Sequence, residues 1–112
     1  MNRLKLVINN NFSRQKFFVK KELKLILNLY AKKVSSGDWK DYSLSVNKKE
    51  ISFDIYQRAS DMPVLRISKS LNPKEKIEKF YVADKNGRII KKSENLVNLI
   101  SKIEWGNLKL VK

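Results

Sequence analysis

The spacing of apolar residues changes from a helical period to a strand period near Gly37, and this change constrains the fold more than any other feature. Over residues 19–35, apolar residues recur at intervals of three and four, which is typical of an amphipathic helix. From Tyr42 onward, apolar and polar residues alternate, which indicates strands with one buried face. The predicted apolar stripe of the helix is Val19, Leu23, Ile26, Leu27, Tyr30 and Val34, with Leu25 and Leu29 on its flank.

The alternating stretch predicts a three-stranded meander followed by a hairpin. Strands at 42–46 and 51–58 are joined by a tight turn at Lys48 and Lys49, and a third strand at 64–69 follows a turn at 60–63. Asn86 and Gly87 readily adopt the positive φ of a hairpin turn, so strands near 78–83 and at 88–91 should pair. Ser93 is the predicted N-cap of a second helix at about 94–103.

This order of elements predicts an α+β fold, in which an antiparallel sheet of four to six strands carries both helices on one face. The opposite face would be exposed to solvent. We expect residues 1–112 to form a single domain, because a chain of this length supports one hydrophobic core. Brief alternation at 3–8 and 107–111 suggests that residues 1–17 and 104–112 are peripheral edge strands or frayed ends.

Cysteine and histidine are both absent from the chain. Their absence excludes disulfides, thiolate catalysis, thiolate zinc sites and the commonest general base. The carboxylates are scattered without the spacing of a metal site, and the three glycines are isolated, so no phosphate-binding loop is present. We therefore expect a non-enzymatic protein with no catalytic residue, no cofactor and no metal.

The formal net charge of +14, from 25 Lys and Arg against 11 Asp and Glu, favours a partner of opposite charge. RNA, DNA and an acidic protein surface all meet this requirement. Compositional bias is the alternative explanation, because Lys outnumbers Arg by twenty to five in a chain that is also rich in Asn and Ile. The oligomeric state stays open.

The amino-terminal stretch is too short and too polar for a signal peptide, and no apolar run has the length of a membrane span. We expect a cytoplasmic protein without a transmembrane segment.

Alternation places aromatic and basic side chains together on the sheet face that is turned away from the helices. Such a face could stack single-stranded bases and hold phosphates, and the alternative is an ordinary solvated face. Trp39 lies between the first helix and the first strand, where it either anchors a partner or caps the core. The candidate partner-binding residues are Tyr56, Arg58, Arg66, Ser68, Lys79, Tyr81 and Trp39, and the basic back of the helix is Lys20, Lys21, Lys24 and Lys32.

Two functional hypotheses follow from these features. The leading one is a non-enzymatic basic binding module that contacts a polyanion or an acidic protein surface. The alternative is a structural accessory subunit that docks on a larger bacterial complex through Trp39 or the flank formed by Leu25 and Leu29. Arg58 and Arg66, as exposed residues, are expected to contribute little to stability.

Several short motifs occur in an order that resembles a known family. Residues 18–30 read Phe-Val-Lys-Lys-Glu-Leu-Lys-Leu-Ile-Leu-Asn-Leu-Tyr, and residues 37–42 read Gly-Asp-Trp-Lys-Asp-Tyr. Arg58-Ala59-Ser60 and the segment from Pro63 to Lys69 continue the pattern. Over about Phe17 to Leu110 the chain resembles the bacterial family called domain of unknown function twenty-seven ninety-four. The resemblance implies a bacterial cytoplasmic protein and supplies no catalytic residue.

Overall fold

The computed structural model describes residues 17–58 and 62–104, and the side chain of Glu104 is not described. Helix α3 (Lys20–Ser35) is followed by strands β1 (Asp41–Val46), β2 (Glu50–Tyr56) and β3 (Leu65–Ser70). A short 3-10 helix, η1 (Lys76–Glu78), leads into β4 (Phe80–Asp84), β5 (Ile89–Ser93) and helix α4 (Leu96–Glu104). The predicted order of helix, meander, hairpin and helix is confirmed.

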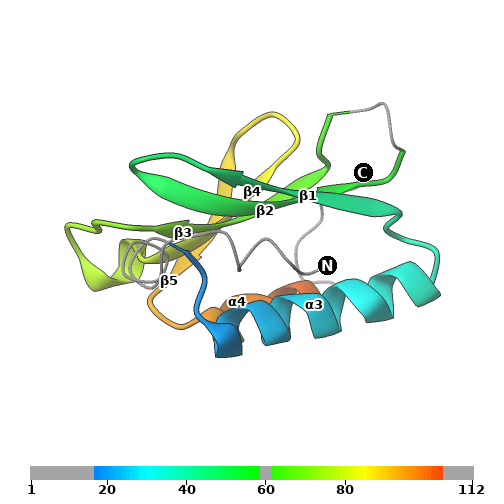
Figure 1. Cartoon of the computed structure of the whole chain (residues 1–112), viewed down its shortest axis with the longest axis horizontal. Coiled ribbons are helices and arrows are strands. Elements are labelled where there is room, and N and C mark those ends of the chain that lie inside the picture. Colours follow the sequence, from blue (N-terminus) through cyan, green and yellow to red (C-terminus); the bar gives the residue numbers. More distant parts are fainter. Residues whose placement is uncertain (1–16, 59–61, 105–112) are drawn as a thin grey trace, which may run out of the picture.

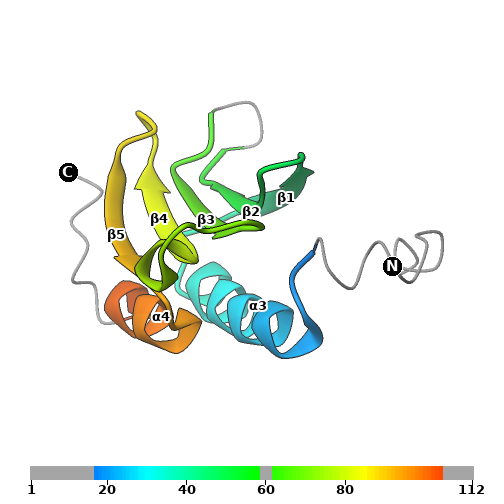
Figure 2. The same ribbon diagram turned by 90° about the vertical axis from the view of Figure 1, so that its left-hand side faces the viewer.

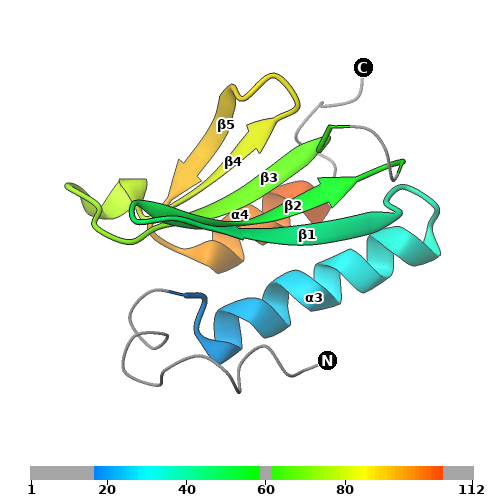
Figure 3. The same ribbon diagram turned by 45° about the horizontal axis from the view of Figure 1, so that its top comes forward.

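The five strands form one antiparallel sheet in the order β1-β2-β3-β4-β5. Both helices cover the same face of this sheet, with α3 beneath β1 and β2 and α4 beneath the other half (Figure 1, Figure 2). Strands β1 and β5 are therefore the two edges of the described sheet (Figure 3). The predicted α+β class and the antiparallel sheet are both confirmed.

The core lies between the sheet and the two helices. In the middle of the sheet, Phe53 of β2 is opposite Ile67 of β3, which is in turn opposite Val82 of β4. All three side chains are buried, and they pack with Ile26 of α3 and Leu99 of α4. Alternation along each strand then directs the neighbouring residues to the face that carries no described helix, called the outer face below.

Helix α3 ends and the β4–β5 turn forms at the glycines where the sequence predicts them. Gly37 has a φ of +86°, and it accommodates the left-handed end of α3 while its N–H donates to Val34 O at 3.0 Å. Gly87 has a φ of +83° in the β4–β5 turn. The Asp84 carboxylate closes that turn by accepting the N–H groups of Asn86 at 2.9 Å and Arg88 at 3.0 Å. These bonds, which favour the charged form, lower the pKa of Asp84.

The apolar stripe of α3 is rotated from the predicted one. Leu29, predicted on the flank, is fully buried together with Ile26. Val19, Leu27 and Val34, predicted to face the core, are substantially exposed. The helix contacts α4 and also the sheet, where its Tyr30 packs against Phe53. Its buried side is therefore centred between these two surfaces, and the periodicity of the helix alone does not determine that position.

The start of α4 also differs from the prediction. Asn95, not Ser93, caps the helix, because its Oδ1 accepts the N–H of Val97 at 2.8 Å. Ser93 ends β5, where its Oγ accepts the N–H of Asn95 at 2.9 Å. The brief alternations at 3–8 and 107–111 lie outside the described residues.

Candidate functional site

Four of the predicted partner-binding residues lie on the outer face. Tyr56 belongs to β2, Arg66 and Ser68 to β3, and Tyr81 to β4. The register places Ser68 opposite Tyr81 and Arg66 opposite Asp54, and these positions alternate with the buried residues that face the helices. The sheet thus brings these four side chains to one face, as the sequence predicts.

A buried carboxylate organises one part of the outer face. Asp54 is only 2% exposed, and its oxygens accept the Arg66 Nε–H at 2.9 Å and the hydroxyls of Ser45 and Ser52 at 2.8 Å each. Arg66 is half-exposed, so one side of its guanidinium faces solvent while Nε is held by Asp54. Arg66 is therefore a structural ion-pair partner in this sheet.

The two tyrosines of the outer face also have partners within the sheet. The Tyr81 hydroxyl donates to Glu50 Oε1 at 2.6 Å, across the intervening strand β3. Burial, followed by this bond to a carboxylate, raises the pKa of Tyr81. The Tyr56 hydroxyl lies 3.1 Å from Ser43 Oγ. Both rings are half-buried, so neither is fully presented to a partner.

Ser68 is buried, and its prediction as an accessible contact residue is wrong. It sits on the central strand β3, where the flanking side chains of β2 and β4 cover so short a residue. Its hydroxyl has no hydrogen-bond partner among the described residues.

The remaining candidates lie away from this group. Trp39 is 8% exposed and packs in the core, with its ring centroid 6.3 Å from that of Tyr30, so its role as a core cap is confirmed. Arg58 is exposed just beyond the end of β2. Lys79 follows η1, and its Nζ lies 5.5 Å from the centre of the Phe80 ring.

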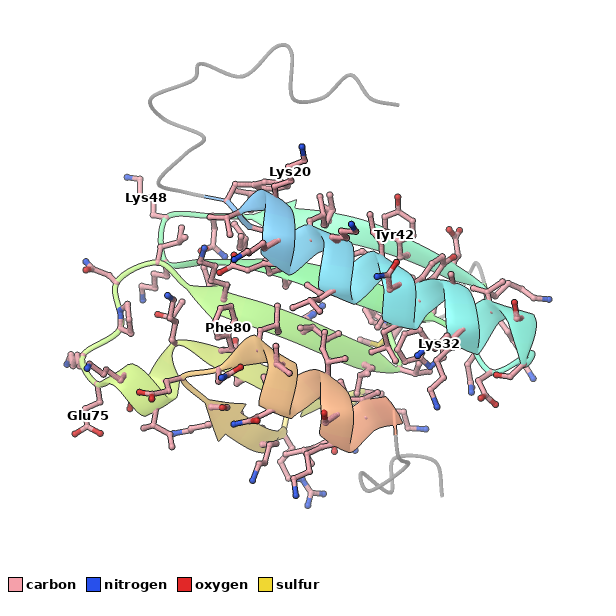
Figure 4. The ribbon with its side chains drawn as sticks, turned by 90° about the horizontal axis from the view of Figure 1, so that it is seen from below. Lys20, Lys32, Tyr42, Lys48, Glu75 and Phe80 are labelled. Atoms are coloured by element: carbon pink, nitrogen blue, oxygen red, sulfur yellow. The ribbon has the colours of Figure 1, made fainter. Side chains whose placement is uncertain are left out.

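The basic back of α3 has the predicted exposure. Lys20, Lys21, Lys24 and Lys32 are all exposed. Lys20 and Lys32 lie near opposite ends of the helix and on opposite flanks of it (Figure 4). The positive charge therefore spreads around the exposed side of α3 instead of forming a single focused site.

The sequence did not identify two features of the site. The first is Lys69, which alternation places toward the helices and which is buried beside Glu22, with Nζ 2.8 Å from Glu22 Oε1. The second is the partial exposure of Tyr42 and Val46, which the strand pattern assigns to the buried face. Neither feature can be read from the alternating pattern alone, because each depends on which elements lie next to the strand in the folded sheet.

A small cleft opens between the β2–β3 connection and the β4–β5 turn. Its volume is about 190 Å³, and Met62, Arg66, Asp84 and Lys85 are among the residues that line it. Pockets for metabolites and cofactors usually have about 300 to 1,000 Å³. Within the described residues, no cluster of three or more Asp or Glu side chains could hold a metal ion, and neither described helix is long and apolar enough to cross a membrane.

A family model described as "Protein of unknown function (DUF2794)" matches residues 16–100. The chain belongs to this family. The match begins just before α3 and ends within α4, so it spans the whole described sheet. Searches of curated proteins and of solved structures find no match. The family description names no activity.

Proposed function

We propose that this chain is a non-enzymatic binding module that contacts an acidic protein surface. The proposal is supported by the net charge of +14 and by the exposed lysines along the back of α3. A surface with this excess of one charge attracts partners of the opposite sign and accelerates their association.

The observation that favours a protein over a nucleic acid is the state of the outer face. A surface that binds single strands needs accessible aromatic rings for stacking and cations for phosphates. Here the hydroxyls of Tyr56 and Tyr81 have partners within the sheet, Arg66 is bonded to Asp54, and Ser68 is buried. Tyr56, Tyr81 and Arg66 are bonded to Ser43, Glu50 and Asp54 of the same sheet, as expected for a structural network.

The non-enzymatic part of the proposal is supported by the structural roles of three carboxylates. Asp54 and Glu22 are engaged in ion pairs, and Asp84 closes a turn. A catalytic acid or base needs access to a substrate as well as a suitable pKa. A structural accessory subunit that docks on a larger bacterial complex is one form that such a module would take, and a cytoplasmic location belongs to the same proposal.

Affinity purification from the native host, with nuclease treatment, tests the proposal. We expect a stoichiometric protein partner that survives nuclease and binds the purified chain directly. The triple variant Lys20→Glu, Lys21→Glu and Lys24→Glu should weaken that binding, because it reverses the charge on the exposed side of α3 without touching the core. The folded state of the variant is checked by circular dichroism.

Nucleic acid is tested in parallel by fluorescence anisotropy with single-stranded RNA and DNA. Any charge-driven binding should be weak and should disappear as salt rises from about 50 to 200 mM. Binding that persists at the higher salt and falls on Arg58→Ala with Arg66→Ala, in a variant that circular dichroism shows to be folded, would contradict the proposal and restore the nucleic-acid hypothesis.

A further inference from the structure

The two edges of the described sheet differ in how they are protected against pairing with another strand. Natural edges are commonly protected by lysines and by bulges. Edge strand β5 carries Lys91 and Lys92, and its pairing with β4 is irregular between Val82 and Ala83. Edge strand β1, Asp41–Val46, contains neither lysine nor proline. The β1 edge is thus the one that can accept a further strand.

Backbone groups of β1 point toward this open side. The N–H of Asn47 donates to Glu50 O at 2.9 Å, so residues of odd number in β1 bond to β2, and Tyr42, Leu44 and Val46 direct their N–H and C=O groups away from it. The N–H of Tyr42 is bonded to the carboxylate of Asp41 at 2.8 Å. The backbone groups of Leu44 and Val46 face the side where no described strand lies.

An apolar surface borders this edge on the side of the helices. Tyr42 is 40% exposed and Val46 53% exposed. The Tyr42 ring is held in place by stacking on Phe53, at 4.6 Å between ring centres, and by an edge contact with Tyr30 of α3 at 5.0 Å. Figure 4 shows Tyr42 on the flank of α3 that is turned away from α4.

Helical spacing extends this surface along α3. Leu27 and Val34 lie three residues before and four residues after Tyr30, so they share its flank of the helix. Both are partly exposed. We use the term β1 edge surface for Leu27, Val34, Tyr42, Leu44 and Val46.

We propose that the β1 edge surface binds an extended, acidic segment of a partner protein as an additional strand of the sheet. This inference rests on the proposed function and specifies its mode of recognition. Backbone hydrogen bonds to Leu44 and Val46 hold the segment, and its alternate apolar side chains cover Tyr42 and Leu27.

The positive charge around the β1 edge favours binding of an acidic segment. Exposed Lys40 and Lys48 stand at the two ends of β1, and exposed Lys20 and Lys24 lie on α3. Asp41 is the acidic residue within β1, and its carboxylate is bonded to the N–H of Tyr42. A second copy of this chain would bring another +14 charge to the same place, which opposes self-association.

The direct test uses a fluorescent synthetic peptide in which alternating Val and Thr are flanked on both sides by Glu. We expect it to bind the full chain, and we expect Val46→Pro to weaken binding by at least about tenfold, because proline removes the outward N–H and leaves the ladder to β2 intact. Val46→Glu should have a similar effect, because it replaces an apolar contact with a charge that repels the acidic peptide.

Two controls make the test specific. Ile89→Glu is matched to Val46→Glu, because Ile89 is 47% exposed on the opposite edge strand, and it should leave binding unchanged. The second control is a peptide of the same sequence in which the backbone nitrogens that would face β1 carry methyl groups. This peptide should not bind, because it lacks the N–H groups that would pair with β1. This second control does not depend on the stability of any protein variant.

Four results would overturn the proposal. The first is equal binding of the methylated and unmethylated peptides, and the second is a dimer of the free chain that Val46→Pro dissociates. The third is protection of the Leu44 and Val46 amides from hydrogen exchange in the free chain. The fourth is that the peptide does not bind. The second would make the edge a self-interface, and the third would show that another part of this chain covers it. Binding of the native partner that needs the α3 lysines but tolerates Val46→Pro would leave the proposed function standing and remove only this mode.

Discussion

Lys69 Nζ donates a 2.8 Å hydrogen bond to Glu22 Oε1 and so joins the inner face of β3 to the first turn of α3. The same ammonium donates to Phe17 O at 3.1 Å, and the same carboxylate oxygen accepts the N–H of Val19 at 2.8 Å. Both charged side chains are largely buried. One ion pair therefore fixes where α3 begins relative to the sheet.

Removing one member of this ion pair should lower the free energy of unfolding. Lys69→Met leaves the Glu22 carboxylate without its cation, and we expect a loss of about 3 kcal/mol in unfolding free energy, measured by urea denaturation. Adding Glu22→Gln should recover part of the loss, because it removes the uncompensated charge and keeps an oxygen for the N–H of Val19. Equal stability of Lys69→Met and the wild type would show that the pair has no structural role.

Two adjacent residues of α3 test the orientation of its buried side. Ile26 is fully buried, whereas Leu27 is partly exposed on the β1 edge surface. Ile26→Ala should cost about 2 to 5 kcal/mol because it opens a cavity in a packed core. Leu27→Ala should cost less than about 1 kcal/mol. Chemical denaturation of both variants gives the comparison, and equal losses would contradict the described orientation of the helix.

The two arginines predicted to act together should contribute unequally to the free energy of unfolding. Arg66→Ala deprives buried Asp54 of its cation, so we expect a loss of about 1 to 3 kcal/mol. Arg58 lies exposed beyond the end of β2, and Arg58→Ala should cost less than about 0.5 kcal/mol. The expectation that both are dispensable for folding is thus revised for Arg66, and thermal unfolding of the single variants checks the revision.

The bond between Tyr81 and Glu50 should appear in the alkaline pH dependence of stability. Because the folded-state pKa of Tyr81 is raised, its contribution is full below the ordinary tyrosine pKa of about 10 and is lost as pH rises through the folded value. Tyr81→Phe should cost about 1 kcal/mol at neutral pH, from the lost hydrogen bond. The stability difference between wild type and variant should narrow as the pH rises above 10, and a constant difference would contradict the raised pKa.

The elements of this fold were largely predictable because their signals are local. Gly37 and Gly87 mark their turns through the backbone conformation that each adopts, and the alternation around Phe53 and Ile67 identifies strands with one buried face. Capping at Asn95 was missed, because Ser93 is an equally suitable residue two positions earlier and local sequence does not choose between them.

The candidate site was less predictable. Alternation correctly placed Arg66, Ser68 and Tyr81 on one face of the sheet, but exposure depends on residues distant in the sequence. Asp54 accepts a hydrogen bond from Arg66 on the neighbouring strand, and Glu50 accepts one from Tyr81 across β3. Pairing of this kind is set by strand register, which connects positions far apart in the chain.

The sequence by itself determined the order of the two α-helices and five strands, the antiparallel pairing of the strands and the strongly basic character of the chain. Only the tertiary structure decided which side of α3 is buried, that Lys69 pairs with Glu22, and that Tyr42 and Val46 lie on an open edge beside Leu27. The physical reason is that periodicity reports which residues share a face of one element. What that face meets depends on its neighbours in space, and an edge strand and a central strand can carry the same alternating pattern.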